Sequence, residues 1–333
     1  MPSAPSPRTS QPRLTRAAVL AAGAAAGAAA LLPLRIGAQA QDTIRVVGPP
    51  NDGYKAVYYG VESGLFKRYN VTVEATLVAS GAAAAAAVIG ASADVAYTNI
   101  LTLIQAHVHD VPLVFVAPGA LLLADASPTS ILVLKDSPIH TGRDLNGKTF
   151  ASASLRDINA AATMAWIDKN GGDSKSVHVV EIPTSAGQAF LEGHRADAVT
   201  LNEPGVSQAL AAGSIRVLAN PYEAVGKRLN TAGFAAMTPI VDKNRDAFGR
   251  FARAMHEASL YTNTHLPDTV AMVARYSGAT PEVVAKSIRF IDAEYLEVSA
   301  MQPLIDMCAR YGLIDKAFPA QEVISPVALR PPR

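Results

Sequence analysis

Short apolar runs alternate with longer helical stretches from residue 44 onward. Runs rich in alternating or β-branched apolar residues predict strands, whereas apolar residues three or four positions apart predict helices. The first set of predicted strands is Ile44–Val47, Val71–Val78, Asp94–Tyr97 and Val111–Ala117. The predicted helices between them are Tyr54–Lys67, Ala82–Ala87 and Ile100–His109, the last capped by Asn99. This alternation favours an α/β protein with mostly parallel sheets and helices on both faces.

The same alternation starts again at Ser130. The predicted strands are Ser130–Leu134, Lys148–Ala151, Val177–Ile182, Asp197–Leu201 and Ile215–Ala219. The predicted helices begin at Ser152–Ser154, at Thr184-Ser185 and at Asn202-Glu203-Pro204. The first of them should end near Asn170, because Gly171 and Gly172 follow. Thr141 and Asp144 resemble the start of a capping box, with aspartate in place of the usual glutamate or glutamine.

After residue 231 the pattern is largely helical, with expected helices from Asp242 to about His265, from Pro267 to Tyr276, from Thr280-Pro281-Glu282, and over Pro303–Tyr311. We expect residues 41–129 and 232–333 to form lobe I, and residues 130–231 to form lobe II inserted into it. The chain then crosses between lobes twice, near residues 117–129 and 221–238. Two crossings make a hinge that allows closure without unfolding.

The first 40 residues have a different pattern. They contain Arg8, Arg13, Arg16 and Arg35 but no acidic residue, and an alanine-rich stretch, Ala17–Leu34, precedes the small residues of Ala38-Gln39-Ala40. A basic region, an apolar region and such a site form a secretory signal peptide. The alternative is a membrane anchor, which needs about 20 strongly apolar residues. We expect residues 1–40 to be a signal peptide that directs the protein to a bacterial periplasm, with the choice between the general and twin-arginine routes left open.

The charge and the cysteine content exclude several classes of function and a disulfide-stabilised fold. Residues 41–333 carry 25 basic and 28 acidic residues, a net charge of −3. This balance offers no basic face for nucleic acid and no polybasic membrane patch. Cys308 is the single cysteine, so it cannot form an internal disulfide, and its apolar neighbours indicate a buried position.

The candidate site lies beyond the carboxyl ends of the strands, where ligands bind in open parallel sheets. Several of these turns are also helix starts, whose backbone N–H groups and hydroxyl or amide side chains suit a small anion or zwitterion. Capping of its own helix is an equal alternative for each residue. The predicted ligand-binding residues are Asn51, Asp52, Tyr54, Ser80, Gly81, Tyr97, Asn99, Ser152, Ser154, Arg156, Asp157, Asn202 and Glu203.

Few of these residues are charged. Arg156 can hold a carboxylate or sulfonate through two parallel hydrogen bonds, although it can also be a solvent-facing arginine beside Asp157. Asp52 and Glu203 can instead accept hydrogen bonds from an amine or a ring N–H. Tyr54 and Tyr97 can flank a flat ligand or simply pack in the core. The sequence therefore leaves the charge of the ligand open.

Catalytic and metal-binding motifs are sparse. His107, His109 and Asp110 are close in sequence, but positions two apart on a helix point about 200° apart, so the histidines should not share a metal. Short phosphate-loop, dinucleotide and nucleophile-elbow motifs do not occur. We expect neither a metal, a cofactor nor a catalytic group.

Several segments resemble the nitrate/sulfonate/taurine class of ABC-transporter substrate-binding proteins. Residues 58–67 resemble the first helix of that class, residues 90–96 its "G-x-x-D" strand start, and residues 137–139 with 144–148 the beginning of its second lobe. Residues 193–197 and Glu203-Pro204 resemble later motifs, so the resemblance spans roughly Ile44 to Pro326.

The resemblance implies a two-lobed type II periplasmic-binding-protein fold, with ligand held by loops of both lobes. It also implies a non-enzymatic role: a monomer that captures a small-molecule solute, here a small organic anion, and delivers it to an ABC permease in the inner membrane. The class includes binders of sulfonates, nitrate, taurine and thiamine-precursor pyrimidines. The alternatives are therefore a pyrimidine binder, or an enzyme of that related group.

Overall fold

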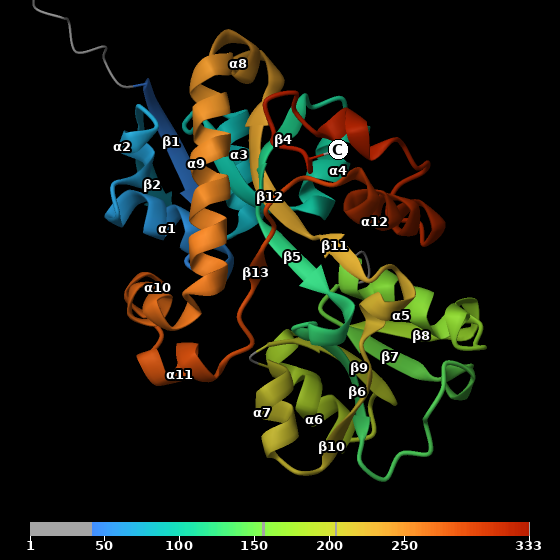
Figure 1. The fold of residues 1–333 in the computed structure, drawn as a ribbon. Coiled ribbons are helices and arrows are strands. Elements are labelled where there is room, and N and C mark those ends of the chain that lie inside the picture. The colour runs from blue at the N-terminus through green and yellow to red at the C-terminus, as the bar shows by residue number, and fades with distance from the viewer. Residues whose placement is uncertain (1–41, 155–156, 204, 333) are drawn as a thin grey trace, which may run out of the picture. The chain divides into compact units, whose positions relative to one another are not determined.

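Two five-stranded sheets and one three-stranded sheet organise the described part of the chain (Figure 1). The computed structural model describes residues 42–154, 157–203 and 205–332. The predicted signal peptide therefore lies outside the described residues. Among the helices that are described, none is long and apolar enough to cross a membrane.

The first sheet has the strand order β2-β1-β3-β12-β4. Its strands are β1 (Asp42–Gly48), β2 (Val71–Leu77), β3 (Val95–Asn99), β4 (Leu113–Pro118) and β12 (Ala232–Met237). Strand β12 runs antiparallel to both β3 and β4, while the other four strands share one direction. The predicted mostly parallel sheet is confirmed, and β12 connects the later part of the chain to it.

Strand β12 is absent from the sequence-based prediction. Its six residues include three alanines and a glycine, and these residue types are depleted in strands. The segment is extended because it hydrogen-bonds to a strand on each side, and it is buried along nearly all its length. Pairing between residues far apart in sequence overrides its weak local preference.

The second sheet has the order β10-β6-β9-β7-β8. Its strands are β6 (Thr129–Leu134), β7 (Thr149–Ser152), β8 (His178–Glu181), β9 (Ala198–Asn202) and β10 (Ile215–Ala219). Strand β6 is antiparallel to β9 and β10, and the remaining pairs are parallel. All five strands come from the segment between residues 129 and 219, as the restarted alternation predicts.

The third sheet links the segments that run between the two larger sheets. Its order is β11-β5-β13, with β5 (Ala120–Leu123), β11 (Arg228–Asn230) and β13 (Ile291–Asp292), and both pairings are antiparallel. Strand β5 precedes β6 along the chain, and β11 follows β10. The two connections therefore run side by side and are hydrogen-bonded to each other.

Helices cover both faces of each large sheet (Figure 1). They are α1 (Lys55–Glu62), α2 (Leu65–Arg68), α3 (Gly81–Ile89), α4 (Ile100–Val108), α5 (Ile158–Lys169), α6 (Gly187–Glu192), α7 (Gly205–Ala211), α8 (Thr238–Lys243), α9 (Arg245–Thr264), α10 (Val270–Ser277), α11 (Pro281–Lys286) and α12 (Val298–Arg310). One core joins the first sheet to α3, α4 and α12, and another joins its opposite face to α1, α9 and α10. The second sheet packs against α5 on one face and against α6 and α7 on the other.

Several predicted boundaries were wrong for local reasons. The helix expected over Tyr54–Lys67 breaks at Gly64, whose φ of 70° is left-handed and starts α2. Helix α5 begins at Ile158 rather than at residues 152–154, because the Asp157 carboxylate accepts a hydrogen bond from the N–H of Asn159. Asp242 does not cap α9; it pairs with Arg245 at 2.6 Å instead. The predicted cap of α4 by Asn99 is confirmed, since its side chain accepts from the N–H of Thr102.

Candidate ligand-binding site

A pocket of 610 Å³ lies where strand ends and helix starts of both large sheets come together. The first sheet contributes residues 97–99 at the end of β3, and the second contributes Thr129 at the start of β6 and Asn202 at the end of β9. The starts of α3 and α5, and the helices α10 and α11, complete the lining. A volume of this size suits a small-molecule ligand.

Eight of the thirteen predicted site residues line this pocket. They are Asn51, Asp52, Gly81, Tyr97, Asn99, Asp157, Asn202 and Glu203. They come from both large sheets and from segments up to about 150 residues apart in sequence, as expected if ligands bind beyond strand ends. Which of them contacts a ligand stays a prediction.

The other predicted residues do not line it. Tyr54 is buried in the core and donates its hydroxyl to the carbonyl of Val46. Ser80 caps α3 by accepting from the N–H of Ala83. Ser152 is buried and donates a long, 3.5 Å hydrogen bond to Asp157 Oδ2. Ser154 is outside the lining, and Arg156 lies outside the described residues.

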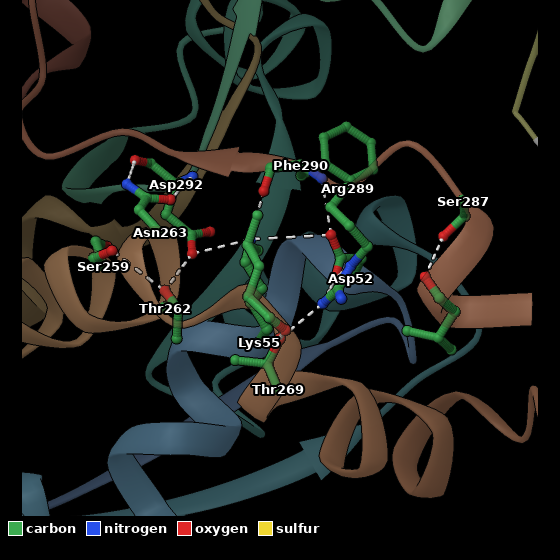
Figure 2. A network of polar contacts seen from close by, with 12 residues as sticks. Asp52, Lys55, Ser259, Thr262, Asn263, Thr269, Ser287, Arg289, Phe290 and Asp292 are labelled. Carbon is green, nitrogen blue, oxygen red and sulfur yellow. Dashed lines mark hydrogen bonds and ion pairs between the residues drawn. The ribbon is translucent and has the colours of Figure 1, made fainter. Parts of the chain in front are cut away.

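Asp52 borders the pocket, but its carboxylate is already bound by the protein (Figure 2). Arg289 Nε donates to Asp52 Oδ1 at 2.7 Å, and the backbone N–H of Phe290 donates to Oδ2 at 2.8 Å. Asp52 was predicted to accept a hydrogen bond from an amine of the ligand, and Arg289 already occupies that carboxylate. The pair holds the segment before β13 against the start of α1.

The same network contains a fully buried ion pair. Lys55 Nζ lies 2.9 Å from Asp292 Oδ2 and donates to the carbonyl of Phe290 at 2.7 Å. Asp292 also accepts from Thr262 Oγ1 at 2.6 Å. Burial raises the pKa of the Asp292 carboxyl, while Lys55 and Thr262 oppose that rise. Figure 2 shows these side chains converging from α1, α9 and β13, which fixes the first sheet's helices to the strand that pairs with β5.

Tyr97 is a largely buried residue of the pocket lining. Burial raises the pKa of its phenol, and the carboxylates of Asp292 and Asp52 add to the rise, so the hydroxyl stays protonated. A Cβ at Gly53 would lie 2.1 Å from Tyr97 Oη. Glycine is therefore required at position 53 for the ring to sit here.

The two remaining carboxylates of the lining act as helix caps. Asp157 accepts from the N–H of Asn159 at 3.2 Å, and Glu203 accepts from the N–H and the hydroxyl of Ser207 at 3.1 and 2.9 Å. Burial raises the pKa of Asp157, although backbone N–H groups at the start of α5 oppose this. These caps place protein carboxylates at two of the helix starts that were predicted to suit a small anion or zwitterion.

Thr98 is a lining residue that the predicted set omits. Its side chain is 1% exposed, and its hydroxyl has no hydrogen-bond partner in the described structure. Gly81 makes this close packing possible, because a Cβ there would lie 3.2 Å from Thr98 Oγ1. Its position at the end of β3 was visible in the sequence, but its lack of a partner was not.

An apolar wall formed by α10, α11 and the segment after them was also missed. It consists of Val273, Ala279, Val283, Val284, Ile288 and Phe290. Val283 is 53% exposed and Ile288 46%. Large apolar side chains that stay this exposed beside a pocket are suited to packing against a ligand. The signal in the sequence was the adjacent pair Val283 and Val284 in α11, because neighbouring positions of a helix cannot both face the core.

The candidate catalytic and metal groups have other structural roles. Among the described residues, no three His, Cys, Asp or Glu side chains are grouped closely enough to hold a metal. His107 Nε2 lies 3.2 Å from Glu322 Oε2, whereas His109 Nδ1 contacts the carbonyl of Gln105 at 2.7 Å. Cys308 is buried in α12, where burial raises the pKa of its thiol to about 12.

The chain has the α/β fold of the periplasmic binding proteins. The profile of the NMT1/THI5-like family matches residues 51–268, and the chain belongs to that family. No curated protein sequence matches the chain.

Solved structures with this fold have diverged far in sequence. The periplasmic aliphatic sulphonate-binding protein SsuA from Escherichia coli superposes with a TM-score of 0.70 at 20% identity, covering 88% of this chain and 95% of SsuA. The alkanesulfonate-binding protein SsuA from Xanthomonas axonopodis pv. citri, bound to MOPS, has a TM-score of 0.63 at 17% identity, with coverages of 85% and 98%. The desulfurization enzyme DszB has a TM-score of 0.60 at 13% identity, with coverages of 86% and 96%. The fold is thus shared by binding proteins and by an enzyme.

Proposed function

We propose that this protein is the periplasmic solute-binding component of an ABC importer. The observation that carries the proposal is the 610 Å³ pocket, which takes its lining from the strand ends of both large sheets. A solute held there gains contacts from both sides at once. Binding would therefore favour a closed arrangement over an open one.

The division into lobes is part of this proposal. Residues 41–129 and 232–333 would form lobe I around the first sheet, and residues 130–231 lobe II around the second. The antiparallel pair of β5 and β11 would be the hinge, since it joins the two connections through the backbone hydrogen bonds of three residue pairs. Rotation at such short segments moves rigid domains without disturbing their cores.

The location and the partners follow from the same role. The predicted signal peptide would export the protein, and the closed form would dock as a monomer on an ABC permease of the inner membrane. The names of the SsuA structures describe periplasmic binding proteins, which supports this location. The experiment is fractionation of cells that express the full chain. Accumulation of a shortened protein in the periplasm is expected, and retention of the full-length chain in the cytosol would contradict it.

Solute capture is tested by thermal unfolding of the purified protein against a small-molecule library. The library should span sulfonates, taurine, nitrate, aromatic carboxylates, amines and pyrimidines. A solute at 100 times its dissociation constant stabilises the folded state by about 2.7 kcal/mol, which raises Tm by several degrees. If no compound at saturating concentration shifts Tm, the proposed capture role is wrong.

The competing function is an enzyme, because DszB shares the fold. A binding role is favoured by the position of Cys308, since its thiol is buried in α12 and does not line the pocket. Incubation of the protein with each solute that shifts Tm, followed by mass spectrometry, separates the two. Unchanged solute is expected, and turnover would establish the enzyme instead.

The organic anion expected from the sequence depends on Arg156. If that residue holds the solute, Arg156→Ala weakens binding of a sulfonate much more than binding of a neutral analogue. Equal effects on both would remove Arg156 from the site. The described lining favours a different ligand charge, for the reasons that follow.

A further inference from the structure

The charged groups of the pocket lining are all acidic within the described residues. Asp52, Asp157 and Glu203 line it, and no described lysine, arginine or histidine does. Asp52 is bound by Arg289. Asp157 and Glu203 each accept hydrogen bonds, and within the described residues neither forms an ion pair, so no described cation balances their negative charges.

Two helix starts that could have held an anion are occupied by these same carboxylates. The Asp157 side chain accepts the N–H of Asn159 at the start of α5, and the Glu203 side chain accepts the N–H of Ser207 in α7. Free backbone donors and the positive end of the helix dipole are what a bound anion uses. A sulfonate placed here would lose those donors and would also meet two negative charges.

A second, independent observation is that one residue of the pocket lining has a buried hydroxyl without a hydrogen-bond partner in the described structure. Thr98 lines the pocket and is 1% exposed, and its buried hydroxyl has no hydrogen-bond partner in the described structure. A buried polar group without a partner is destabilising unless a ligand satisfies it. As a hydroxyl, Thr98 can accept a hydrogen bond from an N–H group.

The apolar wall indicates that the remainder of the ligand is apolar. Val283 and Ile288 are 53% and 46% exposed and line the pocket beside Val273 and Phe290. Covering them with an apolar group removes water from both surfaces, which is favourable in proportion to the area buried. The site therefore combines acceptors for N–H groups with an apolar surface.

We propose that the pocket takes a small organic cation, with an N–H-bearing amine directed at Asp157, Glu203 and Thr98 and an apolar body against Val283 and Ile288. This inference rests on the proposed solute-binding function and names the chemical class of the solute. It differs from the sulfonate ligands that the structurally similar SsuA proteins are named for.

The test uses three probes with the same apolar body: 2-phenylethylamine, 2-phenylethanol and 2-phenylethanesulfonate. Isothermal titration calorimetry with the purified protein gives their dissociation constants. The amine should bind at least about tenfold more tightly than the sulfonate, with the alcohol between them. A sulfonate that binds as tightly as the amine overturns the cation inference and leaves solute capture standing.

The double variant Asp157→Asn with Glu203→Gln removes both charges. Asparagine is itself a good helix cap, so α5 should be retained. The variant should lose at least about tenfold in affinity for the amine and less than about twofold for the alcohol. Glu192→Gln is the matched control, because Glu192 is a carboxylate on α6 outside the pocket lining, and it should change neither affinity.

Unchanged amine affinity in the double variant overturns the inference. So does failure of all three probes to bind, because the pocket then accepts no amine on an apolar body. In that case solute capture is judged separately by the library experiment described under the proposed function.

Discussion

Lys55 Nζ lies 2.9 Å from Asp292 Oδ2, although the two residues are 237 positions apart in sequence. Their side chains are 0% and 2% exposed. The pair joins the start of α1 to β13, the strand that pairs with β5 in the proposed hinge. Lys55 Nζ also donates to the carbonyl of Phe290, which lines the pocket, so the ion pair lies next to the pocket lining.

Lys55→Met should strongly destabilise the protein. Removing one partner of a buried ion pair leaves the other charge uncompensated and costs about 3–5 kcal/mol. The free energy of unfolding from urea titrations measures the loss. The double variant Lys55→Met with Asp292→Leu should recover much of it, because no buried charge is then left alone.

The control for this prediction is Arg245→Met, which breaks the ion pair between Arg245 and Asp242. Those side chains are 60% and 49% exposed, and such surface pairs contribute about 0–1 kcal/mol. A loss of similar size in both variants would show that the burial of Lys55 and Asp292 does not matter.

Thr98→Val should keep the fold and weaken solute binding. Valine has nearly the same shape, and the hydroxyl it removes has no partner in the described structure, so stability should stay the same or rise by up to about 1 kcal/mol. Affinity for the captured solute should fall about tenfold if the hydroxyl binds it. Urea titration and calorimetry measure the two effects separately.

Thr163→Val is the matched control for Thr98→Val. Thr163 is also fully buried, but its hydroxyl lies 2.8 Å from Thr200 Oγ1 and donates to the carbonyl of Asn159. This variant should lose about 1–3 kcal/mol of stability, because it leaves buried partners unsatisfied. If both variants lose stability alike, Thr98 has a structural role instead.

Val283→Ser should weaken binding of a solute with an apolar body without destabilising the fold. Val283 is already 53% exposed, so the free energy of unfolding should change by no more than about 0.5 kcal/mol. Removing apolar contact with a ligand should cost about 1 kcal/mol, or roughly fivefold in affinity. Val217→Ser, at a 43% exposed position of β10 outside the pocket, should leave the affinity unchanged.

Asp144 should make stability depend on pH in the acidic range. The N–H groups of His140 and Thr141 hold the pKa of its carboxyl below the ordinary value of 3.8. A carboxyl with a lowered folded pKa stabilises the protein above its unfolded pKa, and this stabilisation is lost as pH falls through the folded value.

Asp144→Asn should therefore lower Tm at pH 7, and the difference from the unchanged protein should close as pH falls below about 4 and through the lowered pKa of the folded carboxyl. Thermal unfolding across that range measures it. A difference that stays constant with pH would mean that the ionised carboxylate is not what stabilises this turn.

Much of the fold could be predicted from local sequence. The caps at Asn99 and Thr280 and the glycine that ends α3 are local features, because each involves hydrogen bonds or dihedral angles within a few residues. The central strand β12 could not be predicted, since its alanines favour a helix and only its two neighbours in the sheet make it a strand.

For the site, the sequence by itself determined where the pocket lining would gather, because strand ends of a mostly parallel sheet meet at one edge. It could not determine which side chains were already engaged. Arg289 reaches Asp52 across 237 positions. The hydroxyl of Ser80 caps α3, whereas that of Thr98 has no partner in the described structure, and only the surroundings of each residue make this difference. Only the tertiary structure decided which polar side chains of the pocket are already paired, because hydrogen bonds and ion pairs between distant segments form only where folding brings their atoms within about 3 Å.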